Sequence, residues 1–529
     1  MADRFDAIVV GSGFGGAVTA CRLAEAGARV LVLERGRRWT KDQYPRKASD
    51  AWLYSHRRPE KHHGWLDVRL FPGMTVLAGA GVGGGSLCYS SVLLEADDAS
   101  FGAGWPAEVT RAELAPHYAT ARRMLGARTI PEGQLTQRYK LMQRAAERTG
   151  DARRFSAMPL ALTFDEEWNY DLPDAMSARH SKPVHDNGHG KRQGTCVHLG
   201  NCDIGCDVDA KNTLDLNYLA AAENAGAEIR PLHMVRRIEP VGNGYRVAFD
   251  RIENGKLVPG AVEADRVILA AGSLGSTELL LRCRDQYRTL PRVGRSLGQG
   301  WSPNANVLTP DIYPRAADVR QSAGPTISAG MQFMDGGPGS ERFVLEDDGF
   351  PNLLLNALTA KLGSAWLNPL AWALRPFLRR GPGELNPLAR VAVWLGAGVD
   401  AGDGRLTLGR PTFAPWRTDL CLDWNVRKSR RVIDAILRAQ GRLSRAGGGR
   451  LRVPLYWSLL RALVTVHPLG GCRMGSTAAD GVVDHRGEVF GHPNLFVADG
   501  SVMPGPIGWN PSLTIAALAE RGAGLMLRP

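Results

Sequence analysis

Short apolar runs alternate with helical patterns at the start of the chain, and this alternation predicts a parallel sheet flanked by helices. Residues 6–10, Asp-Ala-Ile-Val-Val, form a β-branched apolar run typical of a buried strand. A helical pattern then extends to Ala26, and a second apolar run covers 29–33. Strand, helix and strand in this order predict an α/β domain.

Later segments extend the same alternation. Residues 265–272 form another strand-to-turn unit with a helix expected over 276–282, and 494–499 form a strand that ends in an acid. The last helix is expected over 510–522, because Asn510 suits an N-cap, Pro511 the first helical position and Gly522 the C-terminal stop.

Length and composition narrow the class of protein. A chain of 529 residues exceeds one ordinary core, so several units, or one large and one substrate-shaping domain, are expected. The apolar fraction of 44% and the charged fraction of 22% exclude wholesale disorder. Sixty-two glycines without a Gly-X-Y period indicate nucleotide-binding turns rather than collagen, and eight cysteines are too few for a disulfide scaffold.

Charge and terminal sequence bear on partners and location. The net charge is +12, from 65 basic and 53 acidic residues, with basic concentrations at 375–380 and 427–452. No zinc-finger spacing or RNA-binding signature accompanies it, so no nucleic-acid partner is expected, whereas an anionic nucleotide cofactor suits a basic protein. The first strand begins almost at once, without an export signal, which predicts a cytoplasmic protein.

The first turn has the composition of a dinucleotide site. Gly11 allows the tight turn, Gly13 lets the backbone approach a pyrophosphate, and Gly16 lets the helix pack closely on the strand. Glu34 follows the second strand, where its carboxylate can accept hydrogen bonds from a ribose. This motif alone does not distinguish NAD from FAD.

A second glycine cluster, 79–86, is too rich in glycine to be the interior of a helix or strand. It is either a flexible surface loop or a loop pressed against a large flat cofactor. Near the C-terminus, His467 lies in a Gly/Pro-rich turn over 465–471.

With these motifs together, the chain resembles the glucose-methanol-choline (GMC) oxidoreductase family, in its cholesterol-oxidase-like branch. Five segments carry the resemblance in the family's order: 9–36, 79–91, 267–282, 464–475 and 494–522. The resemblance implies an α/β (α+β overall) fold like that of p-hydroxybenzoate hydroxylase: a Rossmann-like FAD-binding domain and a second β-sheet substrate domain covered by helices. Carried onto this chain, the discontinuous FAD domain covers 1–45, 70–105, 210–305 and 460–529, and the substrate and cap domain covers 106–209 and 306–459.

The resemblance also implies the cofactor site. FAD would bind at Gly11, Gly13, Gly16, Glu34, Gly83, Gly84, Gly85, Ser86, Val235, Asp499, Gly500, Asn510 and Pro511. Some members tether FAD through a histidine in the second glycine segment, and 79–91 contains none, so non-covalent FAD is expected.

Three residues are the implied catalytic group. His467 would act as base or alkoxide stabiliser, Asn510 would orient the substrate oxygen, and Glu346 would be the base that isomerises a steroid double bond. Because Asp347 and Asp348 follow Glu346, an exposed acidic loop is the alternative there. Tyr89 stands where cholesterol oxidases usually have an Asn, so the substrate and redox details can differ.

The expected function is FAD-dependent oxidation of a bulky apolar secondary alcohol, such as a 3β-hydroxysteroid, by hydride transfer to the flavin, with O2 or another electron acceptor. The alternatives are a long-chain alcohol or sugar dehydrogenase of the same family, or a non-redox flavin-holding lyase or sterol-binding protein. Residues 362–378 are apolar and flanked by arginines, which fits either peripheral membrane contact or helices that cap an apolar pocket.

A cysteine-rich segment leaves one further question. Cys196, His198, Cys202 and Cys206 lie within eleven residues, and three thiolates with a histidine can bind zinc or an incomplete iron–sulfur cluster. Related proteins have a further Cys where Leu199 stands, so the four-ligand spacing is broken. A compact turn without a metal is therefore the preferred interpretation.

Overall fold

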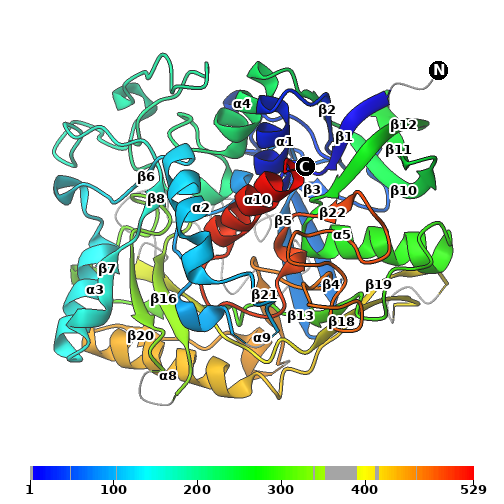
Figure 1. The fold of residues 1–529 in the computed structure, drawn as a ribbon. Helices are drawn as coiled ribbons and strands as arrows, with labels where there is room; N and C mark the ends of the chain where they lie inside the picture. Colours follow the sequence, from blue (N-terminus) through cyan, green and yellow to red (C-terminus); the bar gives the residue numbers. More distant parts are fainter. Residues whose placement is uncertain are drawn as a thin grey trace.

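The computed structural model describes residues 4–47, 49–102, 104–336, 340–351, 390–411, 416–459 and 461–528 (Figure 1). The apolar segment 362–378 and the basic residues 375–380 lie outside the described residues.

A seven-stranded sheet organises the first half of the fold. Its parallel part has the order β9 (Glu228–Arg230), β2 (Val30–Leu33), β1 (Arg4–Val10), β12 (Lys256–Leu269) and β22 (Leu495–Val497), and β10 (His233–Val241) and β11 (Gly244–Glu253) extend β12 as an antiparallel ribbon. All four β2 residues are buried, as expected for a parallel strand covered on both faces. The predicted Rossmann-like α/β architecture is confirmed, with α1 (Phe14–Glu25) linking β1 and β2.

A six-stranded antiparallel sheet forms the second layer, in the order β20 (Arg450–Leu451), β14 (Val307–Ile312), β17 (Val391–Gly398), β16 (Phe343–Asp348), β15 (Ala329–Phe333) and β7 (Phe155–Ala157). Helices α8 (Arg430–Ala446) and α3 (Gln137–Arg148) cover one face, at the bottom and left of Figure 1. Ile436 of α8 packs so closely that a Cβ on Gly396 would lie 2.4 Å from it. Because side chains alternate along a strand, Leu395 points to the opposite face, away from α8.

Helix α10 (Ser512–Met526) occupies the centre of the molecule, packed between α1 and α2 (Arg111–Met124) (Figure 1). It differs from the expected helix at both ends. It begins at Ser512 with Pro511 as N-cap, and it continues through Gly522 to Met526. Burial of nearly every α10 residue between two helices outweighs the tendency of glycine to end a helix.

The remaining elements complete the frame. A four-stranded sheet holds β21 (Leu463–Thr465), β5 (Met74–Gly79), β4 (Leu66–Phe71) and β3 (Leu53–Tyr54), and a three-stranded sheet holds β13 (Gln299–Trp301), β18 (Gly404–Gly409) and β19 (Asp419–Asp423). Two short strands pair with each other, β6 (Ala127–Arg128) and β8 (Leu160–Ala161). Three further helices are α4 (Tyr218–Asn224), α5 (Gly272–Leu281) and α9 (Leu455–Ser458). Helix α5 starts four residues earlier than expected, at Gly272.

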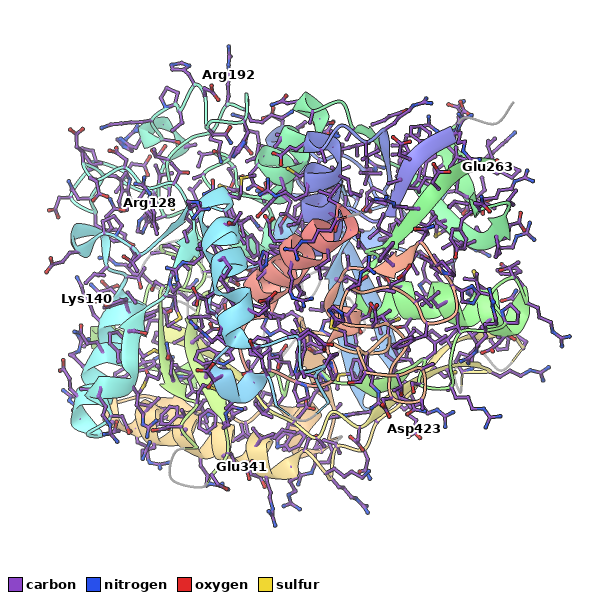
Figure 2. The ribbon with its side chains drawn as sticks, in the orientation of Figure 1. Arg128, Lys140, Arg192, Glu263, Glu341 and Asp423 are labelled. Atoms are coloured by element: carbon purple, nitrogen blue, oxygen red, sulfur yellow. The ribbon has the colours of Figure 1, made fainter. Side chains whose placement is uncertain are left out.

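Charged side chains surround the molecule on all sides of the view in Figure 2, with Lys140, Arg192 and Glu263 far apart near its outline. This distribution fits a solvated surface. In the part of the chain that the structure describes, no helix has the length and apolar character needed to cross a bilayer.

Candidate active site

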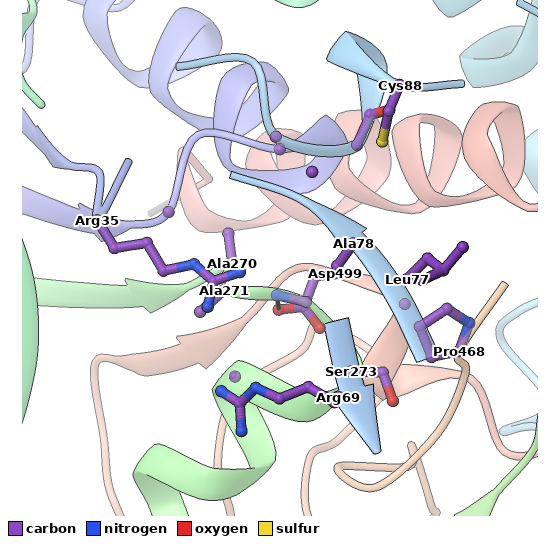
Figure 3. Close-up of a pocket in the computed structure, with 18 of the residues that line it drawn as sticks. Arg35, Arg69, Leu77, Ala78, Cys88, Ala270, Ala271, Ser273, Pro468 and Asp499 are labelled. Carbon is purple, nitrogen blue, oxygen red and sulfur yellow. Dashed lines mark hydrogen bonds between the residues drawn. The ribbon is translucent and has the colours of Figure 1, made fainter. Parts of the chain in front are cut away.

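One large cavity of about 970 Å3 lies where the parallel strands end and the six-stranded sheet begins. Figure 3 shows one end of this cavity, with Asp499, Ala270 and Ala271 in the middle and Arg35 and Cys88 reaching it from different elements. Most of the predicted site residues line this cavity: Gly11, Gly13, Glu34, Gly84, Gly85, Val235, His467, Asp499, Gly500, Asn510 and Pro511. Gly16, Gly83, Ser86 and Glu346 are not among the residues that line it.

The first glycine turn is shaped by close backbone contacts. Gly11 has φ of +98°, and a Cβ on Gly16 would lie 2.2 Å from the Gly11 carbonyl oxygen. By contrast, a Cβ on Gly13 would meet no atom within 4 Å, because Gly13 faces the cavity. Gly13 is also the N-cap of α1, so the unpaired N–H groups of that helix start at the cavity.

Glu34 stabilises the same turn from the end of β2. Its carboxylate accepts hydrogen bonds from the Ser12 amide at 3.1 Å, the Ser12 hydroxyl at 2.7 Å and the Gly36 amide at 2.8 Å. A carboxylate has about four acceptor positions, so one remains for a ribose hydroxyl.

The second glycine segment is not a flexible surface loop. A Cβ on Gly84 would lie 2.7 Å from the Gly13 Cα, so the two glycine turns meet backbone to backbone. The buried Ser86 hydroxyl donates to the Gly83 carbonyl at 2.7 Å and accepts from the Leu214 amide at 3.1 Å. The segment is therefore a fixed wall of the cavity.

Two further segments complete this end of the cavity. Asp499 accepts hydrogen bonds from the Gly272 amide, the Ser276 hydroxyl and the Ser501 amide, which joins α5 to the strand β22 segment. Val235 lies at an irregularity in the pairing of β10 with β11 and lines the cavity.

These observations fit a flavin dinucleotide. Gly13 leaves open space in front of a helix N-terminus, whose positive dipole end favours a pyrophosphate. Glu34 would hold the adenosine ribose, and Gly84, Gly85, Asp499 and Pro511 would surround the flavin and its linker.

His467 has a defined tautomer in the neutral state. Asn306 Oδ1 accepts from the Val466 amide at 3.1 Å, so Asn306 Nδ2 is the atom that faces His467 Nδ1, at 3.0 Å. His467 Nδ1 is therefore an acceptor, and the ring proton is on Nε2. Burial lowers the pKa of His467 to about 4, rather than leaving it suited to titration near neutral pH. At pH 7 the ring offers an N–H donor.

Asn510 is not a helix cap but a link to Glu346. Its Nδ2 donates to Glu346 Oε2 at 3.2 Å, and its Oδ1 has no hydrogen-bond partner among the described residues. The alternative of an exposed acidic loop at Glu346 is wrong, because Glu346 lies in β16 with 0% of its surface exposed. Burial raises the pKa of Glu346 from 4.5 to about 8.

We predict that Glu346→Gln stabilises the protein in a pH-dependent way. In the folded state Glu346 keeps its proton up to about pH 8, whereas unfolded Glu releases it near 4.5, so the free energy of unfolding falls as pH rises between these values. Glutamine does not ionise, so the variant should keep the free energy of unfolding that the wild type loses, about 2–4 kcal/mol at pH 8. Urea unfolding at pH 4 and pH 8 measures the effect, with the exposed Glu132→Gln as control. An equal effect at both pH values would contradict the prediction.

The cysteine-rich segment is folded around hydrogen bonds. His198 uses both ring nitrogens, with Tyr170 Oη at 2.8 Å and Gln134 Oε1 at 3.1 Å, and it stacks on Trp168. The described residues contain no group of three or more His, Cys, Asp or Glu arranged to hold a metal ion. His198 thus has a structural partner on each side.

Sequence reasoning did not identify Asn306 or Lys211. Lys211 is fully buried, and its ammonium donates to the carbonyls of Leu87 at 2.8 Å and Cys202 at 2.5 Å, which joins the second glycine segment to the cysteine-rich segment. The sequence signal for Lys211 is a single lysine within the cysteine-rich stretch 196–214. For Asn306, 161 positions from His467, the sequence offers none.

We predict that FAD is held without a covalent bond. Cys88 is the thiol of 79–91 that lines the cavity, and burial raises its pKa to about 11, so little thiolate is present at neutral pH. Acid precipitation should release the flavin into the supernatant from the wild type and from Cys88→Ala alike. A yellow wild-type pellet and a colourless Cys88→Ala pellet would show a thiol tether instead.

Comparison with known proteins agrees with this geometry. Two segments, 176–298 and 454–519, match GMC oxidoreductase family models, and 9–42 matches an NAD(P)-binding Rossmann-like domain. The chain is 30% identical to a cholesterol oxidase of Acinetobacter baumannii over 98% of this chain and 93% of that protein, and 30% identical to one of Mycobacterium tuberculosis over 99% and 91%. The solved pyridoxine 4-oxidase from Mesorbium loti has the same fold, with a TM-score of 0.62 at 16% identity over 98% of both chains. The chain belongs to the GMC oxidoreductase family and is an FAD-dependent alcohol oxidoreductase.

Proposed function

We propose that this enzyme oxidises a bulky apolar secondary alcohol, such as a 3β-hydroxysteroid, to the ketone. The supporting observation is the wall next to His467 and Asn510. Leu308, Leu395 and Glu346 lie directly opposite one another on β14, β17 and β16, on the face turned away from α8. Leu308 and Leu395 line the cavity, and Ile204, Ile327 and Val92 extend the apolar surface.

Apolar walls favour an apolar substrate over a sugar. Burial stabilises by roughly 25 cal/mol per Å2 of apolar surface, whereas each sugar hydroxyl left without a partner costs about 1–3 kcal/mol. The cholesterol oxidase relatives support the same choice. Accordingly, we assign cofactor binding to 1–45, 70–105, 210–305 and 460–529, and substrate binding to 106–209 and 306–459.

FAD supplies the acceptor for the hydride that leaves the alcohol carbon. The chain supplies hydrogen bonds to the alcohol oxygen: His467 Nε2–H donates to it and stabilises its developing negative charge, and Asn510 Oδ1 accepts a hydrogen bond from the hydroxyl, whose proton passes to water as the hydride leaves. Pro511 and Ser512 line the cavity at the start of α10, so the positive end of that helix dipole also stabilises negative charge there.

Glu346 would act in double-bond isomerisation, with Asn510 between it and the cavity. Since only its ionised form is a base, isomerisation should accelerate as pH rises through about 8.

Anaerobic flavin reduction tests the proposal. A 3β-hydroxysteroid should bleach the flavin at least about 100-fold faster than glucose, a difference of roughly 2.7 kcal/mol. Admission of oxygen then shows whether O2 accepts the electrons. Rapid reduction by glucose without response to sterols would indicate a sugar dehydrogenase instead. Faster reduction by fatty alcohols than by sterols would indicate a long-chain alcohol oxidoreductase. Absence of reduction by any alcohol would indicate a non-redox protein.

A further inference from the structure

A buried turn, residues 302–306, is hydrogen-bonded to both segments that carry the proposed catalytic side chains, His467 and Asn510. It joins β13 to β14 and has the sequence Ser-Pro-Asn-Ala-Asn. All five of its residues are buried. Asn306 contacts His467, and Asn304 is a second asparagine on the same turn, for which the proposed mechanism has no role.

Asn304 makes two hydrogen bonds to the segment that ends at Asn510. Its Oδ1 accepts from the Gly508 amide at 2.8 Å, and its Nδ2 donates to the Trp509 carbonyl at 2.9 Å. That carbonyl belongs to the planar peptide group that joins Trp509 to Asn510. The two bonds therefore fix the backbone from which the Asn510 side chain extends, and an amide is suited to them because it supplies one donor and one acceptor.

The same turn holds the segment that carries His467. Ser302 and Leu469 exchange two backbone hydrogen bonds of 3.0 Å. Asn306 accepts from the Val466 amide at 3.1 Å and contacts His467 Nδ1 at 3.0 Å. The two segments that supply hydrogen bonds to the alcohol are thus attached to one turn.

The turn itself is fixed to the six-stranded sheet in an uncommon conformation. Asn304 and Ala305 have φ of +54° and +43°, a left-handed conformation that alanine rarely adopts and that surrounding contacts must maintain. Asp400 Oδ2 accepts from the Ser302 hydroxyl and the Ala305 amide, both at 2.8 Å. The Gly398 amide, at the end of β17, donates to the Asn304 carbonyl at 3.0 Å. The turn is therefore a rigid support for the segments bound to it.

We infer that Asn304 is a positioning residue for Asn510, and that the turn 302–306 sets the spacing between Asn510 Oδ1 and His467 Nε2. The role rests on the proposed function, in which both groups bind the alcohol oxygen. Two groups that act on one oxygen must keep their separation, because a displacement of about 1 Å can cost about 100-fold in rate. Asn304 is not among the residues that line the cavity, so its effect passes through the backbone of 508–510.

The competing explanation is that position 304 needs asparagine only for its left-handed backbone. Glycine adopts that conformation readily but has no side chain, so Asn304→Gly keeps the turn and removes both hydrogen bonds to 508–509. The limiting rate of anaerobic flavin reduction, measured with the alcohol that reduces the wild-type holoenzyme fastest, should fall by about 10–100-fold. The Kd of the ketone product, which has no hydroxyl proton for Asn510 Oδ1, should change by less than about threefold.

Asn254→Gly is the matched control. Asn254 also has a left-handed backbone, with φ of +50°, but it is exposed in the turn between β11 and β12. Its replacement should leave the rate of flavin reduction unchanged.

Double variants show through which residue Asn304 acts. In Asn510→Ala, Asn304→Gly should lower the rate further by less than about threefold, because the side chain that it positions is absent. In Asn306→Ala, which affects His467 instead, the 10–100-fold effect of about the original size should remain.

Glu346 reports the position of Asn510 without turnover. The hydrogen bond from Asn510 Nδ2 favours the ionised carboxylate and lowers the pKa of Glu346. Displacement of Asn510 should raise this pKa above about 8, so the free energy of unfolding should continue to fall at pH values where that of the wild type levels off. Urea unfolding of the holoenzyme should show this change in Asn304→Gly and in Asn510→Ala. Glu346→Gln should abolish it in both.

Three results would each overturn the inference: reduction by Asn304→Gly at the wild-type rate, a rate loss that persists in full in Asn510→Ala, or an unchanged pKa of Glu346. If Asn304→Gly does not fold, Asn304→Asp serves in the same cycle, because it keeps the acceptor for Gly508 and loses the donor to Trp509. Failure of the proposed function is a different result. No alcohol would then reduce the wild-type flavin, while the pH dependence of unfolding would still show whether Asn304→Gly displaces Asn510.

Discussion

Replacement of His467 by alanine should slow anaerobic flavin reduction by about 10²–10⁴, the usual contribution of a positioned proton donor or acceptor. The imidazole lines the cavity and its hydrogen bond with Asn306 keeps the ring proton on Nε2, so its removal should leave the developing alkoxide with one donor fewer. FAD content should stay near the wild-type value, since the proposed role of the side chain is to contact the substrate. Stopped-flow absorbance and the flavin-to-protein ratio measure both quantities, and reduction at the wild-type rate would remove His467 from the mechanism.

Asn306 provides the matched control for this role. Asn306→Asp would place a carboxylate oxygen against Nδ1, favour the tautomer with the proton on Nδ1, and raise the pKa of His467 above about 4. Above the raised pKa the neutral ring would carry its proton on Nδ1 and lose the Nε2–H donor, so the rate of flavin reduction should fall there. Asn306→Ala should lower the rate without that pH dependence. An unchanged pH profile in Asn306→Asp would mean that this hydrogen bond does not set the state of the ring.

The nucleotide-binding turn could be predicted from the spacing of its glycines. Each glycine there has a role that depends on its immediate neighbours, such as the contact of Gly16 with the Gly11 carbonyl, so spacing alone identifies the structure. Contacts between distant segments had no such signal. The acidic run at 346–348 has the composition of a surface loop. Asp347 can lie in a buried strand because its carboxylate accepts hydrogen bonds from the Ser328 and Ala329 amides, which the sequence does not reveal.

Helix α10 shows the same limit at its ends. Asn510 and Gly522 have the residue types of helix boundaries, but the amide of Asn510 is used by Glu346, 164 residues away, and Gly522 is buried among neighbouring helices. Intrinsic preferences for caps amount to about 1 kcal/mol, which tertiary packing of a largely buried helix exceeds.

Replacing two glycines of the first turn by alanine should have different effects, one on FAD affinity and the other on stability. In Gly13→Ala the new methyl group meets no protein atom within 4 Å, so the protein should fold with near wild-type stability. The methyl occupies the space in front of the α1 N-terminus, however, and should weaken FAD binding by about 100-fold or more, because it keeps the pyrophosphate from the helix amides.

Gly16→Ala is the complementary case. Its methyl would lie 2.2 Å from the Gly11 carbonyl oxygen and 3.0 Å from the Ala270 Cβ, so the strand β1 and helix α1 must separate. The free energy of unfolding of the apoprotein should therefore fall by about 2 kcal/mol or more, beside any loss of cofactor. Urea unfolding of both apoproteins and FAD titration by fluorescence quenching distinguish the two effects. Normal FAD affinity in Gly13→Ala would show that the cofactor phosphates lie elsewhere in the cavity, and normal stability of Gly16→Ala would show that the β1–α1 contact can relax.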